Sequence, residues 1–466
     1  MTDSSVRRSG RYGPWLFAAS AALAGCAPGT GYHTPEFPFR NAFTGAPSSV
    51  APVLLTNADW WRQLDDPVFD ALVGRALAGN ISLALAIERV TEAETGLRGI
   101  APEASLDTEL SARHEGGGGV PDRTRTEARL AFDWLFDIHG ARREQQRGAR
   151  ARIEVADTEV DAARLLLLGN LANAYVDLRH SQRLRQLRRQ ELASRRQTLE
   201  LTRTLYAQDA ATRLDLVQAE ALVSDTNAAL PQLDAAIAAR QHTIAALLGT
   251  APGLLGIDLD RGIRQPRPPL SPEVGIPADL LRNRPDIRIA ERRYYAAHAD
   301  LGAARAEELP QLSLSGTLSL SSAQRSGQPA HVFGPVLRLP AVPGSPRRAA
   351  TEARESQLRQ ARMIWEQTVL DAIAEVETAL AEYGASHRSL RSAERSVQLY
   401  AEAVSLTRAM IEGNGGTLRD LIDAELRLAT ANSQRTENQR QLGRSFVALN
   451  VNLGSGSSHV RGAAAD

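Results

Sequence analysis

Residues 376–411 read VETALAEYGASHRSLRSAERSVQLYAEAVSLTRAMI. No proline interrupts this stretch, and an apolar side chain recurs at every seventh position, at Val376, Tyr383, Leu390, Val397, Val404 and Ile411. A sustained seven-residue repeat is typical of helices that pack side by side in a coiled coil. The stretch is therefore predicted to form part of one arm of a long helical hairpin.

This hairpin occurs twice in the sequence, at residues 140–249 and 345–454. A gap-free shift of 205 positions places Arg142-Arg143 on Arg347-Arg348 and Leu248-Gly249 on Leu453-Gly454. The first arm of each copy, about 65 residues, would extend roughly 100 Å as a helix. Turns are expected at 208–211 and 413–416, each followed by a second helix of about 35 residues. We expect two antiparallel hairpins with both turns at one end.

Segments of alternating polarity precede each hairpin. Within about 104–136, residues 104–114 and 127–136 each place apolar side chains on one face, and a second pair of strands is expected at about 311–339. Two-faced strands of about ten residues fit a lipid-spanning barrel, although a half-exposed soluble hairpin gives the same pattern. Four strands cannot close a barrel, so a membrane location requires several chains that share one barrel.

The N-terminus has the features of a bacterial lipoprotein signal. Arginines at 7, 8 and 11 precede an apolar run at 15–23 and the sequence Leu23-Ala24-Gly25-Cys26. This predicts a signal peptide at 1–25, lipidation of Cys26 and an extended tether at 26–59. The alternative is a chance cysteine after an ordinary signal. Cys26 is the only cysteine, so no intrachain disulfide can form.

Composition argues against an enzyme and against nucleic-acid binding. All 54 basic residues are arginine, balanced by 54 acidic residues, so the glycine run at 116–119 cannot belong to a lysine-containing phosphate loop. The nine histidines form no metal-binding motif, and we expect neither a metal nor another cofactor. The arginine-rich run at 183–189 is read as a solvated or interchain helix face, and with balanced charge we expect no nucleic-acid partner.

Two motifs resemble the TolC-like outer-membrane efflux lipoproteins, the NodT family, and the likeness extends over residues 23–454. The residues that carry it are Trp60-Trp61, Asp65-Asp66-Pro67, Asn80, the segment 275–281 and Arg284-Pro285-Asp286-Ile287. The resemblance implies a mainly α fold with a small β part, formed by a homotrimer whose twelve helices make a tunnel and whose twelve strands make a barrel. The chain then divides into repeat 1 at 60–249, a connector at 250–283, repeat 2 at 284–454 and a flexible tail at 455–466.

The resemblance also implies a function and partners. Members of this family are exit ducts of tripartite efflux systems in the outer membrane of Gram-negative bacteria. A periplasmic adaptor, or membrane fusion protein, docks on the helical tips, and an inner-membrane pump, here expected to be of the RND type, supplies the energy. The residues expected to contact the adaptor are Arg203, Asp209, Arg408 and Asn414.

A gate at the periplasmic end is implied by an Asp-x-x-Asp-Ala pattern, which matches Asp420, Asp423 and Ala424. Asp215 is the equivalent of Asp420 in the first copy and is expected to join the closed-state network. Carboxylates crowded in a pore attract cations and raise one another's pKa. The alternative is that acids in the first turn of a helix only offset its dipole. The family's tyrosine and arginine latch is replaced here by Ile411 and Gly416.

A different function would also explain part of this pattern. A non-conducting coiled-coil lipoprotein of the periplasm would account for the heptads, the tether and the lipid anchor. It would not account for two pairs of two-faced strands of bilayer length or for the family motifs.

Overall fold

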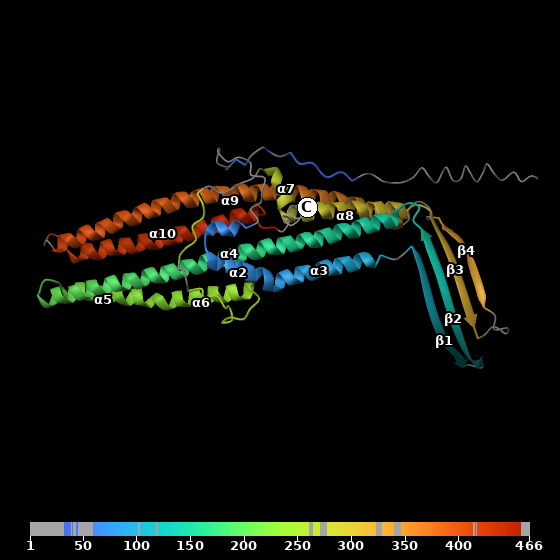
Figure 1. Cartoon of the computed structure of the whole chain (residues 1–466), viewed down its shortest axis with the longest axis horizontal. Coiled ribbons are helices and arrows are strands. Elements are labelled where there is room, and N and C mark those ends of the chain that lie inside the picture. The colour runs from blue at the N-terminus through green and yellow to red at the C-terminus, as the bar shows by residue number, and fades with distance from the viewer. Residues whose placement is uncertain are drawn as a thin grey trace, which may run out of the picture. The chain divides into compact units, whose positions relative to one another are not determined.

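The chain is mainly helical, with one four-stranded sheet (Figure 1). The computed structural model describes residues 32–38, 40, 43–44, 59–100, 103–117, 120–260, 264–270, 277–322, 329–339, 346–412, 415 and 417–457. The predicted signal peptide and lipidation site at Cys26, and the expected contact residue Asn414, lie outside these residues.

The first repeat begins with the 3-10 helix η1 (Trp60–Leu64) and the helices α2 (Pro67–Gly79) and α3 (Ile81–Arg98). The strands β1 (Ala104–Gly117) and β2 (Val120–Phe136) follow, and then the long helix α4 (Ala141–Ala207), α5 (Arg213–Ala228) and α6 (Leu230–Leu247). The elements of this repeat thus follow in the order short helices, two strands and a long hairpin.

The second repeat has the same plan. It contains η2 (Pro277–Asp279), α7 (Leu280–Asn283), α8 (Pro285–Glu307), β3 (Gln311–Ser321), β4 (Ala330–Arg338), α9 (Pro346–Glu412) and α10 (Leu418–Asn452). Helices α4 and α9 are both 67 residues long and start 205 positions apart. The internal repeat of the sequence is thus a repeat of structure.

The return arm of the first hairpin differs from the prediction. One helix of about 35 residues was expected, but α5 ends at Ala228 and α6 starts at Leu230. Pro231 lies in the first turn of α6, where its missing N–H donor costs nothing, whereas inside one continuous helix it would remove a hydrogen bond. Thr436 occupies the equivalent position in the second copy, and α10 runs through it unbroken.

The four strands form an antiparallel sheet in the order β1-β2-β3-β4. The register pairs Leu106 with Phe132, Leu130 with Leu318, and Gly316 with Phe333. Because directly paired residues share a face, the predicted apolar faces merge into one. This face is open, since Leu318 is 44% and Phe333 68% exposed.

The strands contain 14, 17, 11 and 9 residues, so β1 and β2 are longer than the ten residues predicted. Their pairing continues through polar residues as far as Gly117 and Val120, because hydrogen bonding between strands does not depend on alternating polarity. β1 and β4 are the two edges of the sheet within the chain.

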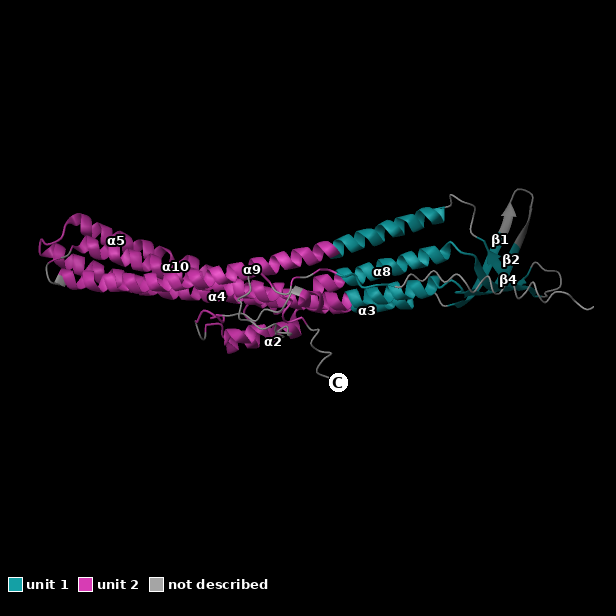
Figure 2. Cartoon of the chain, turned by 90° about the horizontal axis from the view of Figure 1, so that it is seen from above, with its two compact units in different colours: residues 1–36, 90–155, 290–365 teal, residues 37–89, 156–289, 366–466 magenta. Residues whose placement is uncertain are grey.

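The chain divides into two compact units (Figure 2). One contains residues 1–36, 90–155 and 290–365, including the whole sheet, and the other contains residues 37–89, 156–289 and 366–466. Each unit draws on both sequence repeats.

Asp66, in the motif Asp65-Asp66-Pro67, bonds to a buried cluster of aromatic side chains. Phe69 of α2 stacks on Tyr175 of α4, with ring centroids 4.9 Å apart. Asp66 caps α2 by accepting from the amide of Val68 at 3.0 Å, and its other carboxylate oxygen accepts from the Tyr175 hydroxyl. Arg179 Nε in turn donates to the Tyr175 oxygen at 2.9 Å. The motif therefore fixes the start of α2 against the middle of α4.

Asn80 and Arg284, one from each family motif, each donate a hydrogen bond to the end of a helix. Asn80 Nδ2 donates to the carbonyl of Leu247 near the end of α6 at 2.8 Å, and Arg284 Nη1 donates to the carbonyl of Asn452 at the end of α10 at 2.9 Å. Those two carbonyls are 205 positions apart. Arg284 also forms ion pairs with Asp286 and Glu375, at 2.6 and 2.7 Å. Arg284 thus links the end of α10 to the start of α8 and to α9, and we call these contacts the clamp.

The start of the segment predicted as a flexible tail differs from that prediction. Ser455 and Ser457, which the sequence placed in a flexible tail, are buried. Their backbone amides donate to the carbonyls of Asn450 and Gly454, and the Ser457 hydroxyl donates to the carbonyl of Asn283. Among the described residues, the range Pro67–Arg98 is long and apolar enough to cross a membrane, a test that core helices also pass. Asn80 divides this range into α2 and α3.

Candidate functional site

The first hairpin turn places Asp215 at a helix start. After α4 ends, Asp209 adopts a left-handed conformation with φ of 56°, and the chain reverses into α5. Thr212 is the N-cap: its hydroxyl oxygen accepts from the amide of Asp215 at 3.2 Å, while Asp215 accepts from the Thr212 amide at 2.9 Å and its hydroxyl at 2.6 Å. This reciprocal capping box satisfies N–H groups that a helix start leaves unpaired.

The second turn repeats this geometry at Asp420. Thr417 is the N-cap of α10, and its hydroxyl oxygen accepts from the Asp420 amide at 3.2 Å. Asp420 accepts from the Thr417 amide at 3.1 Å and from its hydroxyl at 2.6 Å. The 205-residue shift therefore preserves the cap as well as the acid.

Both capping carboxylates are held in the ionised form. Hydrogen bonds from Thr212 and Thr417 place the pKa values of Asp215 and Asp420 below the ordinary range, because these bonds stabilise the charged carboxylate. Asp420 is exposed and Asp215 is half-buried. Each turn thus presents a fixed negative charge at neutral pH.

Asp423 has a different environment from Asp420. It forms an ion pair with Arg427 one turn later, at 2.9 Å from Asp423 Oδ2 to Arg427 Nε, and both side chains are more than half exposed. Within the described residues no three His, Cys, Asp or Glu side chains form a group that could hold a metal ion. Within one chain, Asp420 is therefore bonded to its capping threonine and Asp423 to Arg427.

The arginines expected at the tips form ion pairs with the return arms of their own hairpins. Arg203 of α4 lies 3.6 Å from Glu220 of α5, and Arg408 of α9 lies 3.2 Å from Glu425 of α10. The two ion pairs are again 205 positions apart. Both arginine side chains are half exposed, so one side of each remains open to solvent.

Sequence reasoning missed the role of Glu425 between the two hairpins. Besides Arg408 of its own hairpin, it accepts from the hydroxyls of Ser194 and Thr198 on α4, at 3.0 and 3.2 Å. A cavity of about 190 Å³ adjoins these contacts and is lined by residues of α4, α9 and α10. The Ala-Glu pair occurs at 219–220 and again at 424–425, but no sequence signal indicated which helix Glu425 faces.

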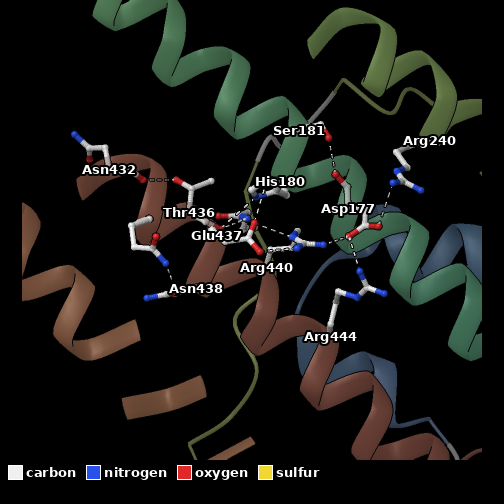
Figure 3. Close-up of polar contacts among 12 residues, drawn as sticks. Asp177, His180, Ser181, Arg240, Asn432, Thr436, Glu437, Asn438, Arg440 and Arg444 are labelled. Atoms are coloured by element: carbon white, nitrogen blue, oxygen red, sulfur yellow. Dashed lines mark hydrogen bonds and ion pairs between the residues drawn. The ribbon is translucent and has the colours of Figure 1, made fainter. Parts of the chain in front are cut away.

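Farther from the turns, an ionic network joins α4 to α10 (Figure 3). Asp177 of α4 lies 3.2 Å from Arg440, 3.8 Å from Arg444 and, across to α6, 3.6 Å from Arg240. Arg440 also pairs with Glu437, which lies 3.6 Å from His180 Nε2. The sequence did not single out these residues, because their partners are distant along the chain.

His180 is the member of this network whose ordinary pKa lies nearest to neutral pH. Its Nδ1 lies 3.3 Å from the carbonyl oxygen of Thr436. Burial lowers the pKa of its imidazole, an effect that the nearby Glu437 carboxylate opposes.

Comparison with known proteins gives the same architecture. Residues 102–250 and 276–455 match the model of the outer membrane efflux protein family. Nodulation protein T of Rhizobium leguminosarum bv. trifolii is 33% identical over 95% of this chain and 97% of its own length. Outer membrane protein OprJ of Pseudomonas aeruginosa is 27% identical over 90% of each chain.

Among solved structures, the outer-membrane channel OprN superposes with a TM-score of 0.83 at 28% identity. The match covers 92% of this chain and 99% of OprN. The family consists of channels rather than enzymes. The chain therefore belongs to the outer membrane efflux protein family and is an outer-membrane channel subunit that serves efflux.

Proposed function

We propose that three copies of this chain form the exit duct of a tripartite efflux pump. The observation that carries the proposal is the sheet, whose apolar face is open and whose edges, β1 and β4, have no partner strand among the residues that the structure describes. Lipid can cover the apolar face but does not tolerate the open edges, because unpaired backbone groups cost several kcal/mol each in a bilayer. Three sheets joined edge to edge make a closed barrel with an apolar outer face.

The helical tips are the proposed docking site for a periplasmic adaptor. Arg203, Asp209, Arg408 and Asn414 are the proposed contacts; the exposure of Arg203, Asp209 and Arg408 supports this. An inner-membrane pump of the RND type completes the assembly. A photo-activatable residue at position 209 should cross-link the adaptor in cells, whereas the same residue at exposed position 170 of α4 should not. Equal cross-linking from both positions would refute a docking site at the tips.

We also propose that Asp420, Asp423 and Asp215 form the periplasmic gate. In a trimer, each aspartate occurs three times around the pore axis. The capping hydrogen bonds keep Asp215 and Asp420 charged, which supports a cation-selective ring.

Planar-bilayer recording tests both the duct and the gate. Wild-type protein should give a discrete, cation-selective conductance, and Asp420→Ala/Asp423→Ala should lower the selectivity. Asp225→Ala/Asp234→Ala removes the same charge farther from the turns and should leave the selectivity unchanged. Unchanged selectivity in the gate variant would exclude the filter.

A closed gate could silence the wild type, so a variant with weakened turns is recorded as well. Thr212→Ala/Thr417→Ala removes both helix caps and should favour the open state. Silence from this variant too would favour the non-conducting spacer.

Lipidation of Cys26 completes the proposal and rests on the sequence Leu23-Ala24-Gly25-Cys26. Mass spectrometry of the mature N-terminal peptide should show a diacylglycerol and an acyl chain on this cysteine. An unmodified thiol would exclude the anchor.

A further inference from the structure

The polar face of the sheet carries two arginines directly opposite each other. The register pairs Arg113 of β1 with Arg125 of β2, and both side chains are exposed. Like charges directly opposite each other in a sheet oppose the pairing of the strands. Within the part of the chain that the structure describes, neither guanidinium group forms an ion pair or a hydrogen bond. The two positive charges therefore face each other without a direct counter-charge.

The neighbouring pairs on this face have a different balance of charge. Closer to the helices, Glu109 is paired with Arg129, so the same two strands also carry a pair of opposite sign. Glu127, which comes next to the arginine pair on this face, supplies one carboxylate for two guanidinium groups. The next pair outward, Glu115 with Arg123, is balanced in charge. The arginine pair thus leaves this end of the face with a net positive charge.

The alternation of side chains decides which way the arginine pair faces in the proposed barrel. Directly paired residues share a face, and neighbours along a strand lie on opposite faces. Leu110 and Leu318 belong to the apolar face, which meets lipid in a membrane barrel. Arg113 lies an odd number of residues from Leu110, so the arginine pair faces the lumen.

The pair lies toward the end of the strands that is farther from the helices. β1 follows α3 and β2 leads into α4, so the strand ends at Ala104 and Phe136 are the ones joined to helices. Arg113 is nine residues after Ala104, which is about 30 Å along the strand and about 23 Å of height at a tilt of about 40°. Because the apolar band of an outer-membrane barrel is about 25 Å tall, the pair lies near its outer rim.

We propose that three such pairs form an anion-binding ring at the outer end of the lumen, and that the ring takes multivalent oxyanions such as phosphates. A guanidinium group presents N–H donors in a planar fork that matches two oxygens of a phosphate. Guanidinium groups around a narrow lumen also raise the local concentration of anions, because low-dielectric walls focus their field. The inference rests on the trimeric duct proposed above and assigns a ligand to its outer opening.

The face on which the arginines lie favours a dissolved anion over a lipid phosphate. A lipid headgroup at this height would meet the opposite, outward face, which carries Ala112, His114 and Thr124. None of these side chains has a permanent charge, and His114 Nδ1 lies 3.2 Å from the Thr124 hydroxyl oxygen. The ligand therefore reaches the ring through the water of the lumen.

Calorimetry with tripolyphosphate tests the ring without requiring an open channel. The wild-type trimer in detergent should bind the anion, and Arg113→Ala/Arg125→Ala should weaken binding about tenfold or more, since one charge-assisted hydrogen bond corresponds to about that factor. Arg89→Ala/Arg98→Ala removes the same charge from exposed positions of α3 and should leave binding unchanged. Absence of binding to the wild type, or equal weakening in both variants, would overturn the assignment.

A charge reversal separates loss of the site from loss of the fold. Arg125→Glu places opposite charges at the pair, as already found at Glu109 and Arg129, and should therefore preserve the heat-modifiable gel mobility. The same variant should lose tripolyphosphate binding. Retained binding in this variant would show that the arginine pair is not the site.

Planar-bilayer recording separates this inference from the duct itself. Tripolyphosphate added on the side of the barrel's outer opening should block the wild type, whereas Arg113→Ala/Arg125→Ala should continue to conduct. Equal block of both proteins would refute the ring and leave the duct intact. If no preparation conducts, the duct proposal fails, while calorimetry still decides whether the arginines bind the anion.

Discussion

Replacing Arg284 by alanine should weaken the fold more than any other single change in the two family motifs. Arg284 is buried and donates to the Asn452 carbonyl while pairing with Asp286 and Glu375. A hydrogen bond from a charged donor contributes about 1.5–3 kcal/mol when buried. The carboxylates are about half exposed, at 47% and 51%, so each ion pair counts for only about 1 kcal/mol. The expected loss is about 3.5 kcal/mol.

Asn80→Ala is the matched control, because the Asn80 side chain makes the equivalent hydrogen bond, to the end of α6, and carries no charge that could form an ion pair. It donates to Leu247 and accepts from the amide of Leu83 as a helix cap, so its loss should cost about 1.5 kcal/mol. Arg284→Lys keeps the charge but not the planar fork that reaches several acceptors, and should fall between the two.

Urea unfolding of the detergent-solubilised protein, followed by far-UV circular dichroism, measures these differences. With a slope of about 3 kcal/mol per molar urea, Arg284→Ala should lower the midpoint by about 1 M and Asn80→Ala by about 0.5 M. A midpoint for Arg284→Ala no lower than that for Asn80→Ala would refute the clamp, since the ion pairs would then contribute nothing.

Three further outcomes are expected. Leu318→Arg, on the apolar face of the sheet, should cost about 2–4 kcal/mol in lipid and abolish heat-modifiable gel mobility, whereas Thr317→Arg on the opposite face should preserve it. Thr417→Ala should cost about 1 kcal/mol and speed amide exchange in the first turn of α10 about fivefold, measured by mass spectrometry; unchanged exchange would exclude the cap. Stability should fall as the pH drops below 6.5, because the unfolded chain then binds a proton that the half-buried His180 imidazole, whose pKa is lowered in the folded chain, resists; His180→Gln should flatten this dependence in urea titrations at each pH.

The long hairpins could be predicted from sequence because three independent signals coincide there. The heptads, the absence of proline and the 205-residue repeat all apply to α9, and α4 follows by equivalence. The break before α6 was not predicted, because Pro231 lies in a return arm, where no heptad pattern marks one continuous helix. The ends of β1 and β2 were missed because the added residues are polar and lack the alternation used to find them.

The candidate site was only partly predictable. Asp215 and Asp420 are recognisable from their repeat and from the threonine three residues before each, which is a capping signal. The pairing of Asp177 with Arg440 is separated by 263 positions and depends on which helices are neighbours. Heptads indicate that a helix packs, but they do not indicate against which other helix, and so the ionic network could not be found from the sequence.

The observed helix cap and the proposed pore ring would have opposite effects on the pKa of the Asp420 carboxyl. The cap hydrogen bonds lower the pKa of Asp420, because they stabilise its charged form. Three like charges around a narrow pore would raise it. In the proposed ring, the cap would therefore oppose the repulsion and keep the Asp420 carboxylates charged at a pH where uncapped acids would start to bind protons. A gate built on capped aspartates should accordingly filter cations across the neutral range and lose its charge only in acid.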